Sequence, residues 1–147
     1  MRDSLPAFQV LLSYGRPDVA AVHSVWRTLQ EARISAWMDI ENIRAGEDWR
    51  PAIKAAMKVS QLVVVFLSKR VVAREGYLQA EIVDALDMQR TKPPGSIFIV
   101  PVRLDDCELH PRLEQFHCIS LSTKEGIDAL VQQILDARVS WLRSTAA

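Results

Sequence analysis

A run of six consecutive apolar residues constrains the fold of this chain more than any other feature. Residues 62–67 are all leucine, valine or phenylalanine, with a polar residue on either side. A strand with one face in water alternates apolar and polar residues, whereas a strand covered on both faces is apolar at every position. The run also falls far short of the roughly 20 residues that span a bilayer. It therefore predicts the central strand of a parallel sheet that is covered on both faces.

Four more segments have the character of strands, and segments with helical periodicity lie between them. The predicted strands are residues 8–13, 34–38, 62–67, 97–102 and 116–121. Apolar residues recur at three- and four-residue spacing in four other segments, which predicts helices with one buried face. These residues are Val19, Val22, Trp26 and Leu29, then Trp49, Ile53, Ala56 and Met57, then Leu78, Ile82, Ala85 and Leu86, and finally Ile127, Leu130, Val131, Ile134 and Trp141.

Local signals mark the starts of the predicted helices. Pro17 and Asp18 suit a first helical turn, because proline needs no hydrogen-bond partner there and a negative charge complements the helix dipole. Asp48 can cap the second helix, and Ser122 with Glu125 has capping-box spacing ahead of the last one. These signals agree with the periodicity on where these three helices begin.

Strand and helix alternate about five times, which predicts one α/β domain. We expect a flavodoxin-like, doubly wound, five-stranded parallel sheet with helices on both faces. Residues 8–142 would form this domain, with residues 1–7 as an N-terminal leader and residues 143–147 as a flexible tail. In such folds the ligand crevice lies at the carboxyl ends of the strands. Residues 13–16, 39–48 and 68–77 each follow a predicted strand, so we expect these three loops to meet at that edge.

Charge and motif content argue against several classes of function. Lysine plus arginine equal aspartate plus glutamate at 18 each, so no net field favours nucleic acid or an anionic membrane. The histidines and cysteines lack metal-ligand spacing, and the chain has neither a Gly-x-Gly-x-x-Gly turn nor a Walker loop. Cys107 and Cys118 fit a reducing compartment and burial in the core, and no apolar signal segment follows Arg2 and Asp3. We expect a cytoplasmic protein with no metal and no resident cofactor.

Four motifs follow one another in a specific order. Residues 12–16 read Leu-Ser-Tyr-Gly-Arg, and residues 37–46 join a strand to a long polar loop. Residues 76–82 place an aromatic residue four positions before a glutamate, and residues 99–107 read Ile-Val-Pro-Val-Arg-Leu-Asp-Asp-Cys. In this order and spacing they resemble the first-strand box, the BB loop, the aromatic-x-x-x-Glu motif and the fourth strand of a Toll/interleukin-1 receptor (TIR) domain of the bacterial, NAD-cleaving branch. The resemblance covers nearly the whole chain.

The resemblance implies an enzyme that cleaves the nicotinamide–ribose bond of NAD+, with Glu81 as the catalytic residue. Such a bond breaks through an oxocarbenium-like ribose cation, which a fixed carboxylate stabilises. Without the resemblance, the helical periodicity would indicate only that Glu81 is a solvent-exposed glutamate on a helix. Tyr77 stands at the position where many family members have tryptophan, and it shares the helix face of Glu81 at i and i+4. Its ring either forms a wall of the substrate pocket or is half-buried by packing.

Five other residues are candidates for the substrate site that the resemblance implies. Tyr14 belongs to the first-strand box, and Asp39 ends the second strand, where it either binds a ribose hydroxyl or forms a turn. Arg16 and Arg44 are candidates for phosphate contacts, because a guanidinium group matches phosphate geometry; either is otherwise a surface arginine. Gly46 is expected to supply a backbone conformation that side chains resist.

Two functions of different classes stay open. The first is an NAD+ glycohydrolase that releases nicotinamide with ADP-ribose or a cyclic ADP-ribose product, in bacterial defence or signalling; its activity would require self-assembly, driven by a sensor domain or protein. The second is a non-catalytic module that signals through TIR–TIR contacts including residues 39–48, or an effector that imitates host TIR domains. A nucleoside deoxyribosyltransferase is disfavoured because its characteristic boxes are missing. A phosphoacceptor receiver needs an acidic pair after the first strand, where residues 13–16 have none.

Overall fold

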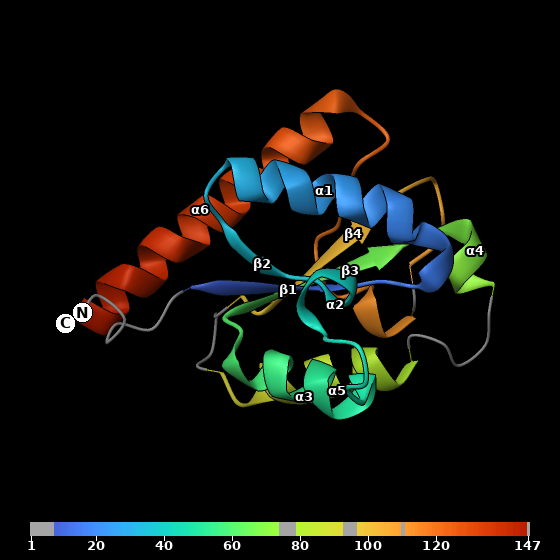
Figure 1. Cartoon of the computed structure of the whole chain (residues 1–147). Coiled ribbons are helices and arrows are strands. Elements are labelled where there is room, and N and C mark those ends of the chain that lie inside the picture. Colours follow the sequence, from blue (N-terminus) through green and yellow to red (C-terminus); the bar gives the residue numbers. More distant parts are fainter. Residues whose placement is uncertain (1–7, 74–78, 93–96, 110, 147) are drawn as a thin grey trace.

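The computed structural model describes residues 8–73, 79–92, 97–109 and 111–146. Within these residues, five parallel strands form one sheet in the order β2-β1-β3-β4-β5 (Figure 1). The strands are β1 (Gln9–Ser13), β2 (Ser35–Trp37), β3 (Leu62–Leu67), β4 (Ile99–Arg103) and β5 (Ile119–Ser120). The parallel sheet confirms the predicted fold class.

The apolar run that dominates the sequence is the central strand. β3 pairs with β1 on one side and β4 on the other, and all six of its residues are buried. The strand order reverses between β1 and β3, because the chain first adds β2 on one side of β1 and then crosses to the other. Such a switch point leaves room for a ligand at the carboxyl ends of the strands.

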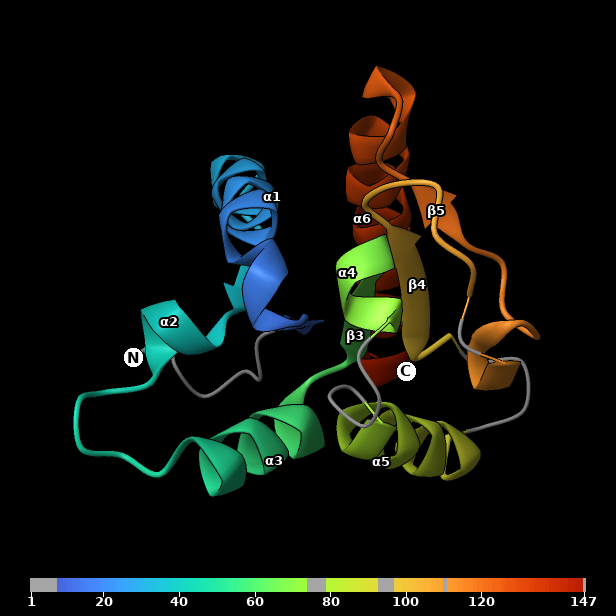
Figure 2. The same ribbon diagram turned by 90° about the vertical axis from the view of Figure 1, so that its right-hand side faces the viewer.

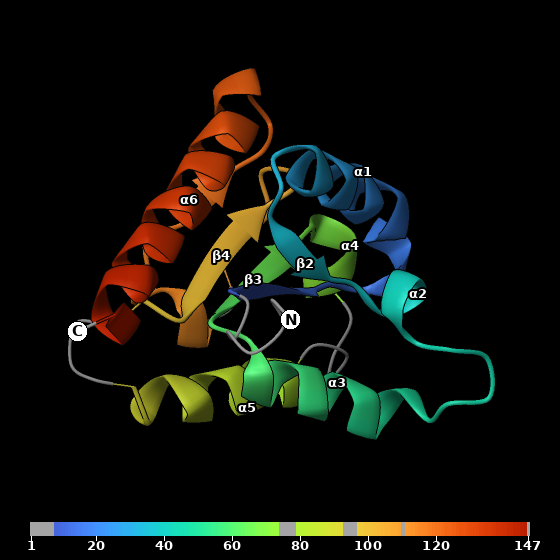
Figure 3. The same ribbon diagram turned by 60° about the vertical axis from the view of Figure 1, so that its left-hand side comes forward.

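Two helical layers cover the sheet. α1 (Val19–Glu31) and α6 (Lys124–Ala146) lie on one face, and α3 (Trp49–Val59) and α5 (Gln79–Arg90) lie on the other (Figures 2 and 3). Shorter helical segments connect them: η1 (Arg16–Asp18), α2 (Asp39–Asn42), α4 (Lys69–Val72) and η2 (Pro111–Leu113).

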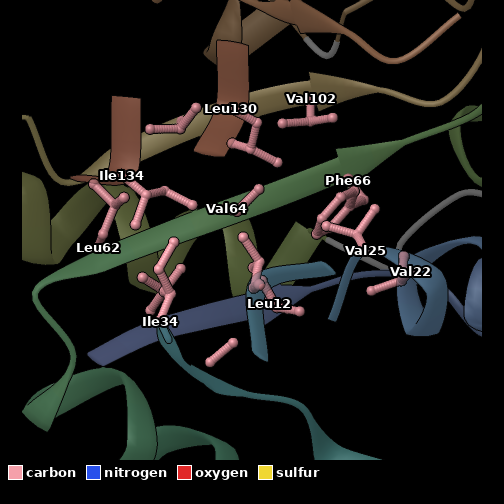
Figure 4. Close-up of a cluster of buried hydrophobic side chains, with 14 of the residues drawn as sticks. Leu12, Val22, Val25, Ile34, Leu62, Val64, Phe66, Val102, Leu130 and Ile134 are labelled. Atoms are coloured by element: carbon pink, nitrogen blue, oxygen red, sulfur yellow. The ribbon is translucent and has the colours of Figure 1, made fainter. Parts of the chain in front are cut away.

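The side chains of β3 alternate between the two hydrophobic cores. Val64 and Phe66 belong to the core beneath α1 and α6, where Figure 4 shows them among residues of those helices. Val63 and Val65 belong to the core beneath α3 and α5. Successive strand residues point to opposite faces, so a strand buried on both faces must be apolar at every position. This is the physical reason for the unbroken run.

Several elements differ from the expectations drawn from the sequence. The predicted loop of residues 39–48 begins with the helical turn α2, and the predicted loop of residues 68–77 begins with α4. β5 is shorter than the predicted strand of residues 116–121. α6 continues to Ala146, so residues 143–146 are helical, and Trp141 packs edge-on against Phe8 with ring centroids 5.6 Å apart. No helix in the described ranges is long and apolar enough to cross a membrane.

Candidate functional site

A cleft of about 230 Å³ opens at the carboxyl ends of β1 and β2. It is lined by the last residues of these strands, by α2 and by the start of α3. The lining residues are Leu11, Leu12, Ser13, Tyr14, Arg16, Trp37, Asp39, Ile40, Ile43, Trp49 and Ile53. The cleft therefore brings together three of the residues that the sequence suggested for the substrate site: Tyr14, Arg16 and Asp39.

Tyr14 and Asp39 are joined across this cleft. Tyr14 follows β1 directly and is 9% exposed, while Asp39 begins α2 after the second strand. The tyrosine hydroxyl donates a hydrogen bond to Asp39 Oδ1, which also accepts from the backbone N–H of Ile40 at 2.8 Å. The two donors fix the direction of the carboxylate, so the cleft contains an oriented negative group beside an aromatic wall.

Arg16 provides positive charge at the same cleft. It is the first residue of η1, and its side chain is exposed. Among the described residues that line the cleft, Arg16 is the only one with a cationic side chain. A cleft with a carboxylate and an exposed guanidinium can bind a ligand that carries both hydroxyl and phosphate groups.

Trp49 was expected in the core, and this expectation is wrong. Its side chain is 47% exposed and forms part of the cleft, together with Ile40, which is 54% exposed. Trp49 is the first residue of α3, at the end of the helix that reaches the cleft. The guanidinium of Arg50 lies 5.3 Å from the centre of the Trp49 ring.

Arg44, the candidate phosphate contact in the loop of residues 39–48, does not reach the cleft. Arg44 is exposed and does not line the cleft, and its backbone N–H donates to the Glu47 carboxylate at 2.9 Å. Gly46 has φ +89°, the left-handed conformation that glycine adopts most readily, as the sequence predicted. Asp48 accepts from the backbone N–H of Arg50 at 3.2 Å, which confirms it as the N-cap of α3.

A buried polar brace, which sequence reasoning missed, holds α4 at the same edge of the sheet. The Ser68 hydroxyl donates to Asp18 Oδ2 at 2.7 Å and accepts from the backbone N–H of Val71 at 3.3 Å. Asp18 is 5% exposed and Ser68 is 3% exposed. Both oxygens of Asp105 accept from the backbone N–H of Lys69 at 3.1 Å. The brace thus connects the ends of β1, β3 and β4.

The ion pair beside this brace is on the surface. Lys69 Nζ lies 2.8 Å from Asp106 Oδ1. The hydrogen bond to the Asp106 carboxylate, with its charge, raises the pKa of Lys69, and the same contact lowers the pKa of Asp106. Both groups are exposed, so the pair adds little to stability.

The predicted catalytic residue lies at the limit of the described structure. The backbone of Glu81 belongs to the first turn of α5, and its side chain lies outside the described part of the structure. Tyr77 also lies outside the described residues. In a parallel α/β fold the helix after a strand begins near the carboxyl edge of the sheet, so the start of α5 belongs to the same edge as the cleft.

A histidine contact holds α2 against α1 behind the cleft. His23 Nε2 lies 2.8 Å from Glu41 Oε2, and the imidazole stacks on the Trp26 ring with centroids 5.5 Å apart and an interplanar angle of 8°. Sequence reasoning gave His23 no role, because its partner is 18 residues away. The contact restrains the helical turn that begins with Asp39.

Neither cysteine thiol is favoured in the thiolate form, which is the form that acts as a nucleophile. Burial raises the pKa of the Cys107 thiol to about 11, and burial also raises the pKa of Cys118. Cys107 is buried as expected, whereas Cys118 is only half-buried. Within the described ranges no group of three or more His, Cys, Asp or Glu side chains is placed to hold a metal ion.

Fold and site together define a doubly wound α/β domain with a polar cleft at the carboxyl edge of its parallel sheet. The family model for the TIR domain matches residues 10–135, and the chain belongs to this family. No curated protein matches the sequence.

Solved structures show the same fold at low sequence identity. The TIR-STING receptor from C. gigas, solved in complex with 2′,3′-cGAMP, is 21% identical with a TM-score of 0.73; the match covers 88% of this chain and 40% of the receptor. The TIR domains of the activated Roq1 resistosome, which recognises the pathogen effector XopQ, are 19% identical with a TM-score of 0.65. This match covers 88% of this chain and 98% of the Roq1 chain. The TIR domain of the Toll-related receptor TRR-2 from Hydra magnipapillata is 18% identical with a TM-score of 0.63. This match covers 85% of this chain and 96% of the TRR-2 domain. The chain thus spans less than half of TIR-STING.

Proposed function

We propose that this TIR domain is an NAD+ glycohydrolase that cleaves the bond between nicotinamide and ribose. The observation that carries the proposal is the cleft in which Tyr14 holds the Asp39 carboxylate and Arg16 stands at the same site. These groups suit a dinucleotide substrate: the carboxylate can accept from ribose hydroxyls, and the guanidinium can pair with the pyrophosphate. The apolar residues Ile43 and Trp49 offer a surface for a flat ring.

The departure of nicotinamide requires no proton transfer. The C–N bond to nicotinamide breaks as the ribose becomes an oxocarbenium-like cation, and nicotinamide departs as a neutral base. A carboxylate next to the ribose stabilises this cation, and Glu81 is assigned that role by its motif. Water then forms the new bond to the same ribose carbon and releases a proton to the solvent. In the cyclic case a nucleophilic nitrogen of the adenine forms that bond instead.

The test is nicotinamide release from NAD+ by the purified chain, at high concentration or tethered on a surface so that it is clustered. Glu81→Ala should lower turnover at least about a hundredfold, as loss of transition-state stabilisation does elsewhere. Glu125→Ala is the matched control, because Glu125 is an exposed glutamate in the first turn of α6. It should keep full activity. Equal activity of wild type and Glu81→Ala would remove Glu81 from the mechanism.

The second candidate is a non-catalytic interaction module. It is favoured by two exposed apolar residues, Ile40 within residues 39–48 and Trp49 directly after them, since exposed apolar side chains at one edge suit a protein contact. Absence of nicotinamide release under enforced clustering would favour this function over the enzyme.

A further inference from the structure

The outer surface has a second depression, which shares no lining residue with the cleft. It lies between α3 and α5, which run side by side under the sheet (Figure 2), and has a volume of about 320 Å³. We call it the α3–α5 groove. Its lining residues are Lys54, Met57, Lys58, Asp84, Asp87, Met88 and Thr91. The two methionines give it an apolar floor, and Met57 belongs to the core below.

The two walls of this groove carry opposite charges. Lys54 and Lys58 stand one turn apart on α3, and both are exposed. Asp84 and Asp87 stand on α5, with Asp87 exposed and Asp84 half-buried. Among the described residues, no ion pair joins one wall to the other. The α3 wall is therefore basic and the α5 wall acidic, and neither neutralises the other directly.

One of these charges has a partner on its own helix. Asp87 Oδ1 lies 3.7 Å from Arg90 Nη1, and both side chains are more than half exposed. An exposed pair at this separation is weak and is readily exchanged for another partner. Asp87 thus stays available for a contact from outside.

We propose that the α3–α5 groove binds the same groove of a second copy of this chain about a two-fold axis. α3 and α5 both connect parallel strands, so they run in the same direction. An axis that lies along the groove, in the plane of the contact, places the α3 wall of each copy over the α5 wall of the other. Lys54 and Lys58 then face Asp84 and Asp87 of the second copy, and this contact occurs twice.

Charge complementarity selects a second copy over other occupants. A uniformly acidic partner, including a nucleic acid, meets the repulsive α5 wall, and a uniformly basic partner meets the repulsive α3 wall. The groove fits a surface with a basic wall and an acidic wall in the opposite arrangement, which is what its own two-fold image presents. The methionines of the two floors meet between the walls, and such flexible apolar side chains adapt well to a contact.

The contact uses a different set of residues from the cleft. None of the groove residues lines the cleft, and a closed two-fold contact ends at a dimer. The inference does not depend on NAD+ cleavage, because its test measures mass and not activity. It also differs from self-association through residues 39–48, which contribute nothing to the groove.

The test uses two variants of the chain and their mixture, with mass measured by light scattering and sedimentation. One variant carries Lys54→Glu and Lys58→Glu, so that both of its walls are acidic. The other carries Asp84→Lys and Asp87→Lys, so that both are basic. Each variant alone should dimerise at least about tenfold more weakly than wild type, because like charges face each other. An equimolar mixture should regain the dimer, since every wall then meets its opposite.

Two controls accompany the mixture. A variant with Lys124→Glu and Arg143→Glu changes two exposed charges on α6, on the other face of the sheet, and should dimerise like wild type. Raising the salt concentration from about 50 to about 500 mM should weaken the wild-type dimer, because surface ion pairs are screened. Thermal unfolding confirms that each variant is folded. If a charge-reversed variant does not fold, the neutral variant Lys54→Gln with Lys58→Gln is measured in its place. Its dimer should also be weaker than that of wild type.

Three outcomes would overturn the inference. Wild type that remains monomeric up to about 1 mM has no such contact at useful strength. A dimer that persists in both reversed variants uses another surface. Open chains that depend on these residues would show a head-to-tail contact, not a two-fold one.

Discussion

Tyr14 and Asp39 show how single residues shape the cleft. They are 25 positions apart in the sequence, and their hydrogen bond joins the end of β1 to the start of α2. Tyr14 is 9% exposed, so this hydrogen bond is largely shielded from water. The bond therefore holds the carboxylate in place before any ligand arrives.

Tyr14→Phe removes this hydroxyl and leaves the ring. We expect the free energy of unfolding to fall by about 1 kcal/mol, because Asp39 loses one donor while the aromatic packing stays. Urea unfolding measures the change. Thr28→Val is the control, since the hydroxyl of the half-buried Thr28 donates within its own helix, to the carbonyl oxygen of Ser24. A change no larger than that of the control would show that the Tyr14–Asp39 bond does not stabilise the fold.

Cys107 gives a prediction about pH. Burial raises the pKa of its thiol from 9.0 to about 11 in the folded chain. Between these values the unfolded chain loses the proton and the folded chain keeps it, so stability is full below pH 9 and falls as the pH rises through 11. Cys107→Ala should show a shallower decline than wild type over this range. Parallel curves for the two proteins would contradict the assigned shift in pKa.

At the scale of elements, α4 shows how a short helix is fixed by its neighbours. Four helical residues are too few to be stable alone. Ser68 caps the helix, Asp18 accepts from Ser68, and Asp105 accepts from the backbone N–H of Lys69. These contacts come from the ends of three strands, which explains why the sequence of residues 68–77 alone indicated only a loop.

Ser68→Ala should destabilise the domain by about 2 kcal/mol, because it removes the cap and leaves the buried Asp18 carboxylate without this donor. Ser68→Thr retains the hydroxyl and should recover most of the loss. Chemical unfolding gives the free energies, and amide hydrogen exchange of Val71 and Val72 reports the helix itself. Equal stability of the alanine and threonine variants would contradict the hydrogen-bonded brace.

At the scale of the whole molecule, the sheet is an internal partition between two cores. β3 supplies alternate residues to each core, and each face has its own pair of helices. The sheet therefore loses stability when either face is disturbed. In a sheet with one face in water, substitutions on the covered face would lower stability and those on the solvated face would not.

Val64→Ala and Val65→Ala test this arrangement, because the two residues are neighbours that face opposite cores. Each should lower the free energy of unfolding by about 2 kcal/mol, since both valines are fully buried and each change leaves a cavity. Urea unfolding of the two variants beside wild type measures the effects. A near-neutral result for one of them would mean that its face is not closed.

The sequence by itself determined the architecture, because secondary structure and burial leave periodic patterns in the chain. The apolar run of β3, the alternation of strands with amphipathic helices and the Asp48 cap are local, and each predicted its element correctly. The same alternation placed Tyr14, Arg16 and Asp39 at one edge of the sheet.

Tertiary structure alone decided which of these residues meet and where the elements end. The Asp18–Ser68 bond joins residues 50 positions apart, and the helical end of α6 lies where Trp141 contacts Phe8. Trp49 is 47% exposed at the start of α3, although its spacing matches the buried face of that helix. Local patterns specify which face of an element is apolar. Only the arrangement of neighbouring elements specifies whether that face is covered, and which polar groups become partners.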